Sequence, residues 1–99
     1  MRVLLAEDDP VLGHALRVGL GQEGIDVAWT RDGIDAYTAF QQSDHDALVL
    51  DLELPGLHGL DLLYRVRQSN WQVPVIVVTA HGDVADRVGI RSPSLYNHF

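Results

Sequence analysis

The chain has 99 residues, enough for one compact domain and too few for two. Fourteen acidic residues face seven basic ones, all arginine, so the net charge is −7 and the chain is expected to repel nucleic acid and anionic membranes. Lysine and cysteine are absent, which excludes disulfides, thiolate catalysis and any step that needs a lysine ammonium.

No apolar run approaches the roughly 20 residues that span a bilayer, and acidic residues follow the apolar start of the chain at once. We therefore expect no signal peptide and no membrane segment. Because disulfides are also excluded, a cytoplasmic protein fits best.

The first expected elements are a strand and a helix. Residues 2–6 form a short apolar run, which is typical of a strand covered on both faces. Asp9 before Pro10 is typical of a helix N-cap followed by a proline at the first helical position. Apolar residues then recur at helical spacing as far as Leu20, and the glycines after it predict the helix end.

The chain then alternates strand and helix. Further strands are expected where short apolar or alternating runs occur, at 25–30, 47–50 and 74–79. Helices are expected where apolar residues recur at helical spacing, at 36–43 and 60–67. Since each connection is about one helix long, the pattern predicts an α/β fold with a parallel sheet and right-handed crossovers.

Polar side chains stand at the carboxyl ends of these strands, where functional residues of parallel sheets collect. If the first and third strands are neighbours, Glu7, Asp8 and Asp51 converge, and such a cluster favours a divalent cation such as Mg²⁺. Asp51 precedes a Pro-Gly loop and would be an accessible carboxylate nucleophile toward phosphorus. Thr79 would hydrogen-bond a phosphoryl oxygen, and the small Ala80 would leave room for it.

Each residue also has a plainer interpretation. Asp9 is expected mainly to cap the helix. A lone aspartate at a strand end is more often a turn residue than a nucleophile, and a threonine such as Thr79 is more often an ordinary strand residue. Both tryptophans are expected to serve packing. The histidines lack metal-ligand spacing and are expected on the surface: His14, His45, His58, His81 and His98.

Three segments together resemble the receiver domain of two-component response regulators, most closely the branch with a C-terminal winged-helix DNA-binding domain. They are residues 4–10, 51–60 and 73–80. The resemblance covers residues 1–88 and implies a flavodoxin-like sheet with strand order 2-1-3-4. It implies a phosphoacceptor signalling domain, not an enzyme, which receives phosphate from a histidine kinase with Mg²⁺.

The resemblance also implies a role for each site residue. Asp51 would accept the phosphate, and Asp8 and Asp51 would bind Mg²⁺ together with the backbone carbonyl of Glu53. Glu7 would complete the acidic pair and act through a water. Thr79 would supply the switch hydroxyl that contacts the phosphoryl group, and Ala80 would be the small residue beside it.

The chain departs from that family after the fourth strand. Family members continue through a fourth helix, a fifth strand that carries a Lys-Pro pair, an aromatic switch residue and a closing fifth helix. No residue after Thr79 matches the fifth strand, so the sheet is expected to stop before it. The missing lysine is expected to weaken the signalling response.

Residues 88–99 resemble instead the helix-turn-helix of tetracycline-repressor-like regulators, which favours a fused or truncated chain with a tail over 89–99. The alternative is a natural receiver with an unusual C-terminal end. Gly89 would be the turn, Ser92 the N-cap and Pro93 the first helical residue. Tyr96 and His98 would take recognition-helix positions. DNA binding by this chain is not expected, because such a motif needs supporting helices and a dimer.

A second function stays open beside the phosphoacceptor. A sheet that stops at strand 74–79 leaves an apolar edge, which is a template for pairing or strand exchange. The alternative is therefore an interaction module that forms a homodimer or a swapped oligomer.

Overall fold

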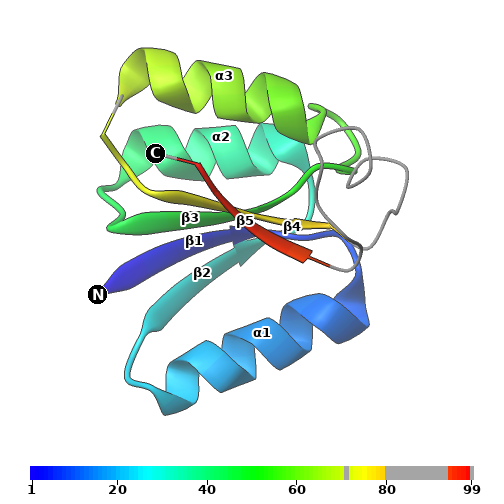
Figure 1. The fold of residues 1–99 in the computed structure, drawn as a ribbon, viewed down its shortest axis with the longest axis vertical. Coiled ribbons are helices and arrows are strands. Elements are labelled where there is room, and N and C mark those ends of the chain that lie inside the picture. Colours follow the sequence, from blue (N-terminus) through cyan, green and yellow to red (C-terminus); the bar gives the residue numbers. More distant parts are fainter. Residues whose placement is uncertain (71, 80–93, 99) are drawn as a thin grey trace.

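The computed structural model describes residues 1–70, 72–79 and 94–98. Its helices are α1 (Pro10–Gln22), α2 (Gly33–Gln42) and α3 (Gly59–Ser69). Its strands are β1 (Arg2–Ala6), β2 (Asp26–Thr30), β3 (Ala47–Asp51), β4 (Val75–Thr79) and β5 (Ser94–His98). The first four strands are parallel and lie in the order β2-β1-β3-β4, so the predicted α/β fold and strand order are confirmed (Figure 1).

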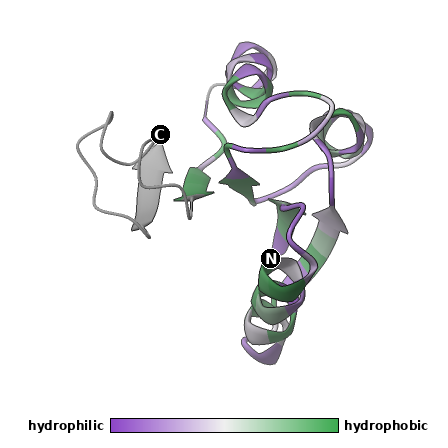
Figure 2. Cartoon of the chain, turned by 90° about the vertical axis from the view of Figure 1, so that its right-hand side faces the viewer, coloured by the Kyte–Doolittle hydropathy of each residue, from purple (hydrophilic) through white to green (hydrophobic). Residues whose placement is uncertain are grey.

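The sheet has a helical layer on each side (Figure 2). Successive strand residues point to opposite faces, so β1 sends Leu4 to one side and Val3 with Leu5 to the other. The larger core lies under α2 and α3 and includes the fully buried Leu62 and Val66. The smaller core lies on the α1 side. The two apolar faces of each strand explain why these runs are continuously hydrophobic.

Each described helix begins at a side-chain cap. Asp9 accepts the Val11 N–H at 2.9 Å with Pro10 as the first helical residue, as predicted. Asp32 accepts the Asp35 N–H at 2.7 Å at the start of α2. His58, expected only as a surface residue, caps α3 through its Nδ1. None of these helices is long and apolar enough to cross a membrane.

The prediction that the sheet ends at the fourth strand is wrong. β5 pairs antiparallel with β4 along its whole length, from Thr79 opposite Ser94 to Val75 opposite His98. The backbone N–H and C=O groups of a strand edge need partners, and β5 supplies them on this side of β4. The expected open β4 edge is therefore covered.

The same strand corrects the interpretation of the tail. Tyr96 and His98, placed by the resemblance on a recognition helix, lie in an extended strand. A helix of a few residues is marginal without tertiary support, whereas an adjacent strand edge offers a hydrogen-bonded partner at once. Gly89, Ser92 and Pro93 lie outside the described residues, and the boundary at residue 88 stays a prediction.

Candidate functional site

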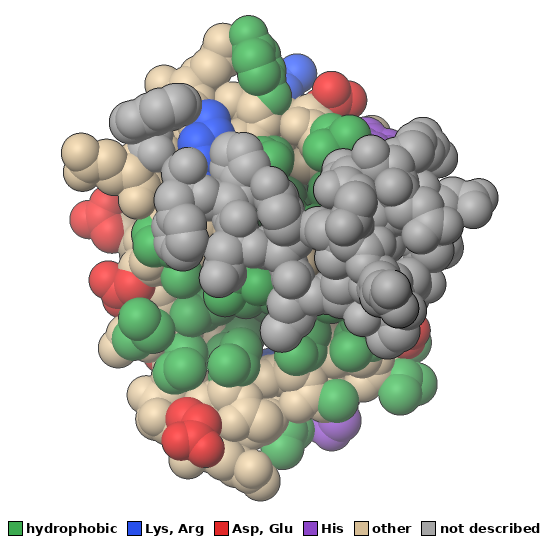
Figure 3. All heavy atoms as spheres, in the orientation of Figure 1, with side chains coloured by type: hydrophobic (Ala, Val, Ile, Leu, Met, Phe, Trp, Pro, Cys, Tyr) green, Lys and Arg blue, Asp and Glu red, His purple; other side chains and the backbone are tan. Residues whose placement is uncertain are grey.

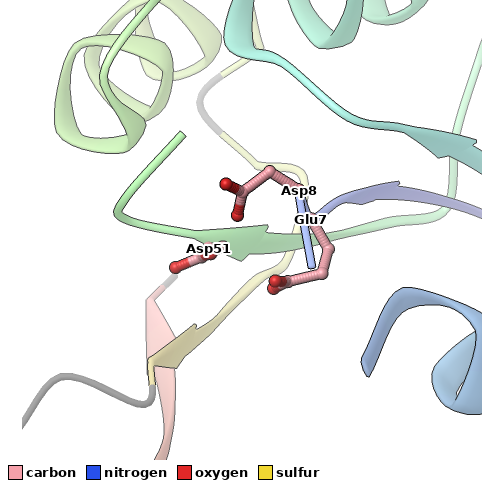
Figure 4. A group of neighbouring side chains, drawn as sticks. All are labelled: Glu7, Asp8 and Asp51. Atoms are coloured by element: carbon pink, nitrogen blue, oxygen red, sulfur yellow. The ribbon is translucent and has the colours of Figure 1, made fainter. Parts of the chain in front are cut away.

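Three carboxylates meet at the carboxyl ends of two neighbouring strands (Figure 4). Glu7 and Asp8 follow β1 directly, and Asp51 is the last residue of β3. Because β1 and β3 pair in parallel with Ala6 opposite Leu50, the residues that come next lie together. One oxygen from each carboxylate lies within 4.8 Å of the others. The convergence expected from the sequence is present.

The cluster has a buried side and an open side. Glu7 is 3% exposed and Asp51 7% exposed, whereas Asp8 is exposed. Three carboxylates this close repel one another, and two of them have lost most of their contact with water. The arrangement is unfavourable in the fully ionised state unless a proton or a cation neutralises it.

Burial raises the pKa of the Glu7 carboxyl from 4.5 to about 7. That value already includes the charges of Asp51 and Asp8 and a hydrogen bond with Asp51, which also raise the pKa, and the Asp9 N–H, which lowers it by donating to Glu7 Oε1 at 3.1 Å. Near neutral pH the cluster therefore holds a proton on Glu7 for part of the time. A divalent cation would compete with that proton.

The raised pKa of Glu7 predicts that, without divalent cations, the free energy of unfolding falls as the pH rises from 4.5 to about 7. In this window the folded protein keeps a proton that the unfolded chain has released, so raising the pH favours unfolding. This loss of stability is absent below pH 4.5 and complete above about pH 7. The free energies of unfolding of the native chain and of Glu7→Gln, measured with urea, should therefore diverge by roughly 1–3 kcal/mol across this pH window.

The matched control is Glu53→Gln, which changes an exposed carboxylate on the loop after β3 and keeps Glu7. In this variant the free energy of unfolding should fall with rising pH as it does in the native chain. Parallel stability curves for the native chain and Glu7→Gln would contradict the assignment.

Side chains at the end of β2 hold the backbone of the acidic pair. Trp29 Nε1–H donates to the Glu7 carbonyl at 2.9 Å, and Arg31 donates to the Asp8 carbonyl at 3.1 Å. The Glu7 N–H in turn donates to the Thr30 carbonyl. Sequence reasoning missed these supports and gave Trp29 only a packing role. The parallel pairing of β1 with β2 was the signal, because it places residues 29–31 beside residues 5–8.

The loop after β3 orients Asp51. The Glu53 N–H donates to Asp51 Oδ1 at 3.1 Å, and the Gly59 N–H donates to the Leu52 carbonyl at 3.0 Å. The loop passes through Gly56 at φ +79°, a backbone conformation that favours glycine. Metal binding by the Glu53 carbonyl stays a prediction.

Gly59 lets the start of α3 approach Asp51. A Cβ at this buried position would lie 2.5 Å from both the Asp51 carbonyl oxygen and the Leu52 Cα, so the backbone would have to move. Gly59→Ala is therefore expected to lower the free energy of unfolding by about 1–3 kcal/mol, as overpacking does. Urea unfolding measures the change.

Gly19→Ala is the control for that prediction. Gly19 lies within α1, and a Cβ there would meet nothing within 4 Å. Alanine is expected to stabilise the helix by up to about 1 kcal/mol. Equal effects at the two glycines would contradict the close approach at Gly59.

The other expected phosphoryl contacts come from β4. Val78 pairs with Asp51 across the sheet, so the backbone of Thr79 follows beside the acidic end. The role of the Thr79 hydroxyl stays a prediction. Ala80, His81 and Trp71 lie outside the described residues.

A family model described as the response regulator receiver domain matches residues 3–94. The response regulator protein PmrA of Pseudomonas aeruginosa is 48% identical over 88 residues, which are 89% of this chain and 40% of that protein. The transcriptional regulatory protein QseB of Haemophilus influenzae is 42% identical over 93% of this chain and 42% of that protein. The chain thus spans less than half the length of these curated relatives.

Two solved structures share the fold of this chain, and both contain Mg²⁺. The response regulator TrrA of Thermotoga maritima, in complex with Mg²⁺ and BeF, has a TM-score of 0.80 at 27% identity, over 86% of this chain and 74% of that one. A receiver domain of a sensor histidine kinase of Pseudomonas aeruginosa has a TM-score of 0.81 at 31% identity, over 88% and 73%. That structure holds a magnesium ion coordinated in the active-site cleft.

Proposed function

Because the chain belongs to the family of response regulator receiver domains, we propose that it accepts a phosphoryl group on Asp51 from a phosphohistidine of a histidine kinase. The observation that carries the proposal is the meeting of Glu7, Asp8 and Asp51 at one end of the sheet. The curated relatives extend well beyond the matched part, so the proposal covers the receiver step alone. Family membership also supports the expected cytoplasmic location.

The donor set of the site fits Mg²⁺. This ion prefers a few carboxylate oxygens with several waters retained, and the cluster offers three carboxylates, one of them open to solvent. Asp8 and Asp51 would hold it, with the Glu53 carbonyl as a further ligand and Glu7 acting through water. When bound, Mg²⁺ neutralises the carboxylates and stabilises the charge on the transferring phosphoryl oxygens.

In the proposed transfer an Asp51 carboxylate oxygen attacks phosphorus. The new O–P bond forms as the N–P bond of the phosphohistidine breaks, and the electron pair returns to the imidazole nitrogen, which then takes up a proton. The Glu53 N–H, which donates to Asp51 Oδ1 at 3.1 Å, would help to orient the carboxylate for this attack. Thr79 would then donate its hydroxyl to a phosphoryl oxygen.

The sequence given contains no lysine, and this bears on the response to phosphorylation. The family resemblance implies a lysine at the phosphoryl group, and this sequence has none. We therefore propose that Asp51 accepts phosphate but that the phosphorylated chain transmits a weakened response.

Acetyl phosphate tests the transfer without a kinase. Incubation with acetyl phosphate and Mg²⁺ should add the mass of one phosphoryl group to the intact chain, because the O–P bond of the donor breaks and acetate leaves. EDTA should prevent the increment. An unchanged mass at every Mg²⁺ concentration would contradict the proposed function.

The alternative function, an interaction module, rested mainly on an open β4 edge, which the structure does not show. A homodimer or swapped oligomer was expected from an open β4 edge, and β5 pairs along that edge. We therefore do not propose strand exchange as a second function.

A further inference from the structure

The backbone pairing between β1 and β2 stops just before the acidic pair. Ala6 is the last paired residue of β1, so the carbonyl groups of Glu7 and Asp8 lie beyond the ladder and need other partners. Two side chains at the end of β2 supply them. Trp29 Nε1–H donates to the Glu7 carbonyl at 2.9 Å, and the Arg31 guanidinium donates to the Asp8 carbonyl at 3.1 Å. Side chains thus continue the pairing where the backbone ladder ends.

These two bonds restrain the backbone of Asp8 on both sides. A peptide unit is planar, so a hydrogen bond to its carbonyl restrains the rotation of the whole unit. The unit that follows Glu7 sets φ of Asp8, and the unit that follows Asp8 sets its ψ. With both carbonyls held, the direction of the Asp8 Cα–Cβ bond is fixed relative to β2.

The position of the Asp8 carboxylate depends on this backbone more than the positions of its neighbours do. Glu7 and Asp51 are 3% and 7% exposed, and the backbone N–H groups of Asp9 and Glu53 donate to their carboxylates. Asp8 is exposed, and within the described ranges its carboxylate has no hydrogen bond. Its approach to within 4.8 Å of the other two therefore follows from the direction of its backbone (Figure 4).

The two donors differ in how firmly they are held. The Trp29 ring packs against buried apolar residues of β1 and β3, on the side where hydrophobic side chains gather above α1 (Figure 3). Its N–H therefore cannot leave the Glu7 carbonyl without disturbing this packing. Arg31 is exposed and has a longer, more flexible side chain. We expect Trp29 to contribute more than Arg31.

We propose that Trp29 and Arg31 are positioning residues for Mg²⁺ binding: they hold the backbone of Asp8 so that its carboxylate is aimed at the ion before the ion arrives. This inference rests on the proposed function, in which Asp8 binds Mg²⁺. A ligand that is already ordered loses less conformational entropy on binding. Groups that orient metal ligands commonly change metal affinity by about 10–100-fold.

Removal of the indole N–H is the first test. Trp29→Phe keeps an aromatic ring, and replacement of Trp29 by 3-benzothienylalanine keeps the shape of the indole with sulfur in place of the N–H. Calorimetry should show Mg²⁺ binding about tenfold weaker than in the native chain for both variants. Without Mg²⁺, ¹⁵N relaxation should give the Asp8 amide an order parameter below the value of about 0.85 that is typical of rigid backbone.

Arg31→Met separates hydrogen bonding from charge, because the two predict opposite results. Loss of a positive charge near the acidic cluster would by itself strengthen Mg²⁺ binding. Loss of the hydrogen bond to the Asp8 carbonyl should weaken it, and we expect a net weakening of about threefold. Tighter binding in Arg31→Met would show that Arg31 acts through its charge and would overturn its positioning role.

Val27→Ala is the control for a general loss of packing. Val27 lies in the same strand as Trp29 and packs against the same core, but an aliphatic side chain cannot donate a hydrogen bond to the acidic pair. This variant should lower the free energy of unfolding in urea. It should leave the Mg²⁺ affinity and the Asp8 order parameter unchanged.

The outcomes distinguish this inference from the proposed function. If the native chain binds no Mg²⁺, the proposed metal site is wrong and the positioning role is wrong with it. If the native chain binds Mg²⁺ and the 3-benzothienylalanine variant binds it equally well, only the positioning role of Trp29 is wrong. An equal loss of affinity in Val27→Ala would assign the effect to packing and would also overturn the inference.

Discussion

Replacing Asp51 by asparagine is expected to abolish labelling by acetyl phosphate completely. Asparagine has nearly the same shape, and its side-chain oxygen can still accept the Glu53 N–H, so the loop after β3 should keep its form. An amide oxygen is too weak a nucleophile to attack phosphorus in place of a carboxylate. Intact mass spectrometry measures the increment, and near-UV circular dichroism checks the fold.

Glu53→Gln is the matched control for this variant. Glu53 lies two residues further along the same loop, its side chain is exposed, and only its backbone carbonyl is assigned to the site. It should be labelled as the native chain is. A phosphoryl increment that persists in Asp51→Asn would show that another residue accepts the group.

Asp8→Asn is expected to weaken Mg²⁺ binding by roughly 100-fold. The change removes one of three carboxylates within 4.8 Å of one another. At a partly buried site the loss of one charge beside a divalent ion costs on the order of 3 kcal/mol. Isothermal titration calorimetry with Mg²⁺ measures the affinity, and labelling by acetyl phosphate should then require correspondingly more Mg²⁺.

Asp9→Asn separates the metal site from general effects of charge. Asp9 is the next residue and is also an exposed aspartate, but its carboxylate caps α1. Asparagine caps helices about as well as aspartate, so the fold should be unchanged. Mg²⁺ affinity should fall less than about threefold, because Asp9 lies outside the cluster. A similar loss in both variants would contradict the assignment of Asp8 as a ligand.

Much of the fold could be predicted because each element carries its own local signal. The Asp9-Pro10 pair marks the start of α1, and the β-branched run before Thr79 marks β4. The meeting of Glu7, Asp8 and Asp51 followed from strand order, since residues at the ends of neighbouring parallel strands must be close.

The features that were missed depend on contacts between distant segments. Nothing local distinguishes residues 94–98 from a short helix, and their pairing with β4 decides their conformation. His58 looked like any surface histidine, because its capping role depends on where the loop after Asp51 turns into α3. The support of Glu7 by Trp29 likewise requires the register between β1 and β2.

Trp29 gives the acidic site a connection to the opposite side of the sheet. Its indole N–H holds the Glu7 carbonyl, its ring packs with the core on the α1 side, and the Arg17 guanidinium lies 5.6 Å from the ring centroid. Gly13 of α1 has no room for a side chain against the same ring. We therefore expect a shift of the Glu7 backbone to move the Trp29 indole against α1, and Trp29 fluorescence should change with events at the carboxylates.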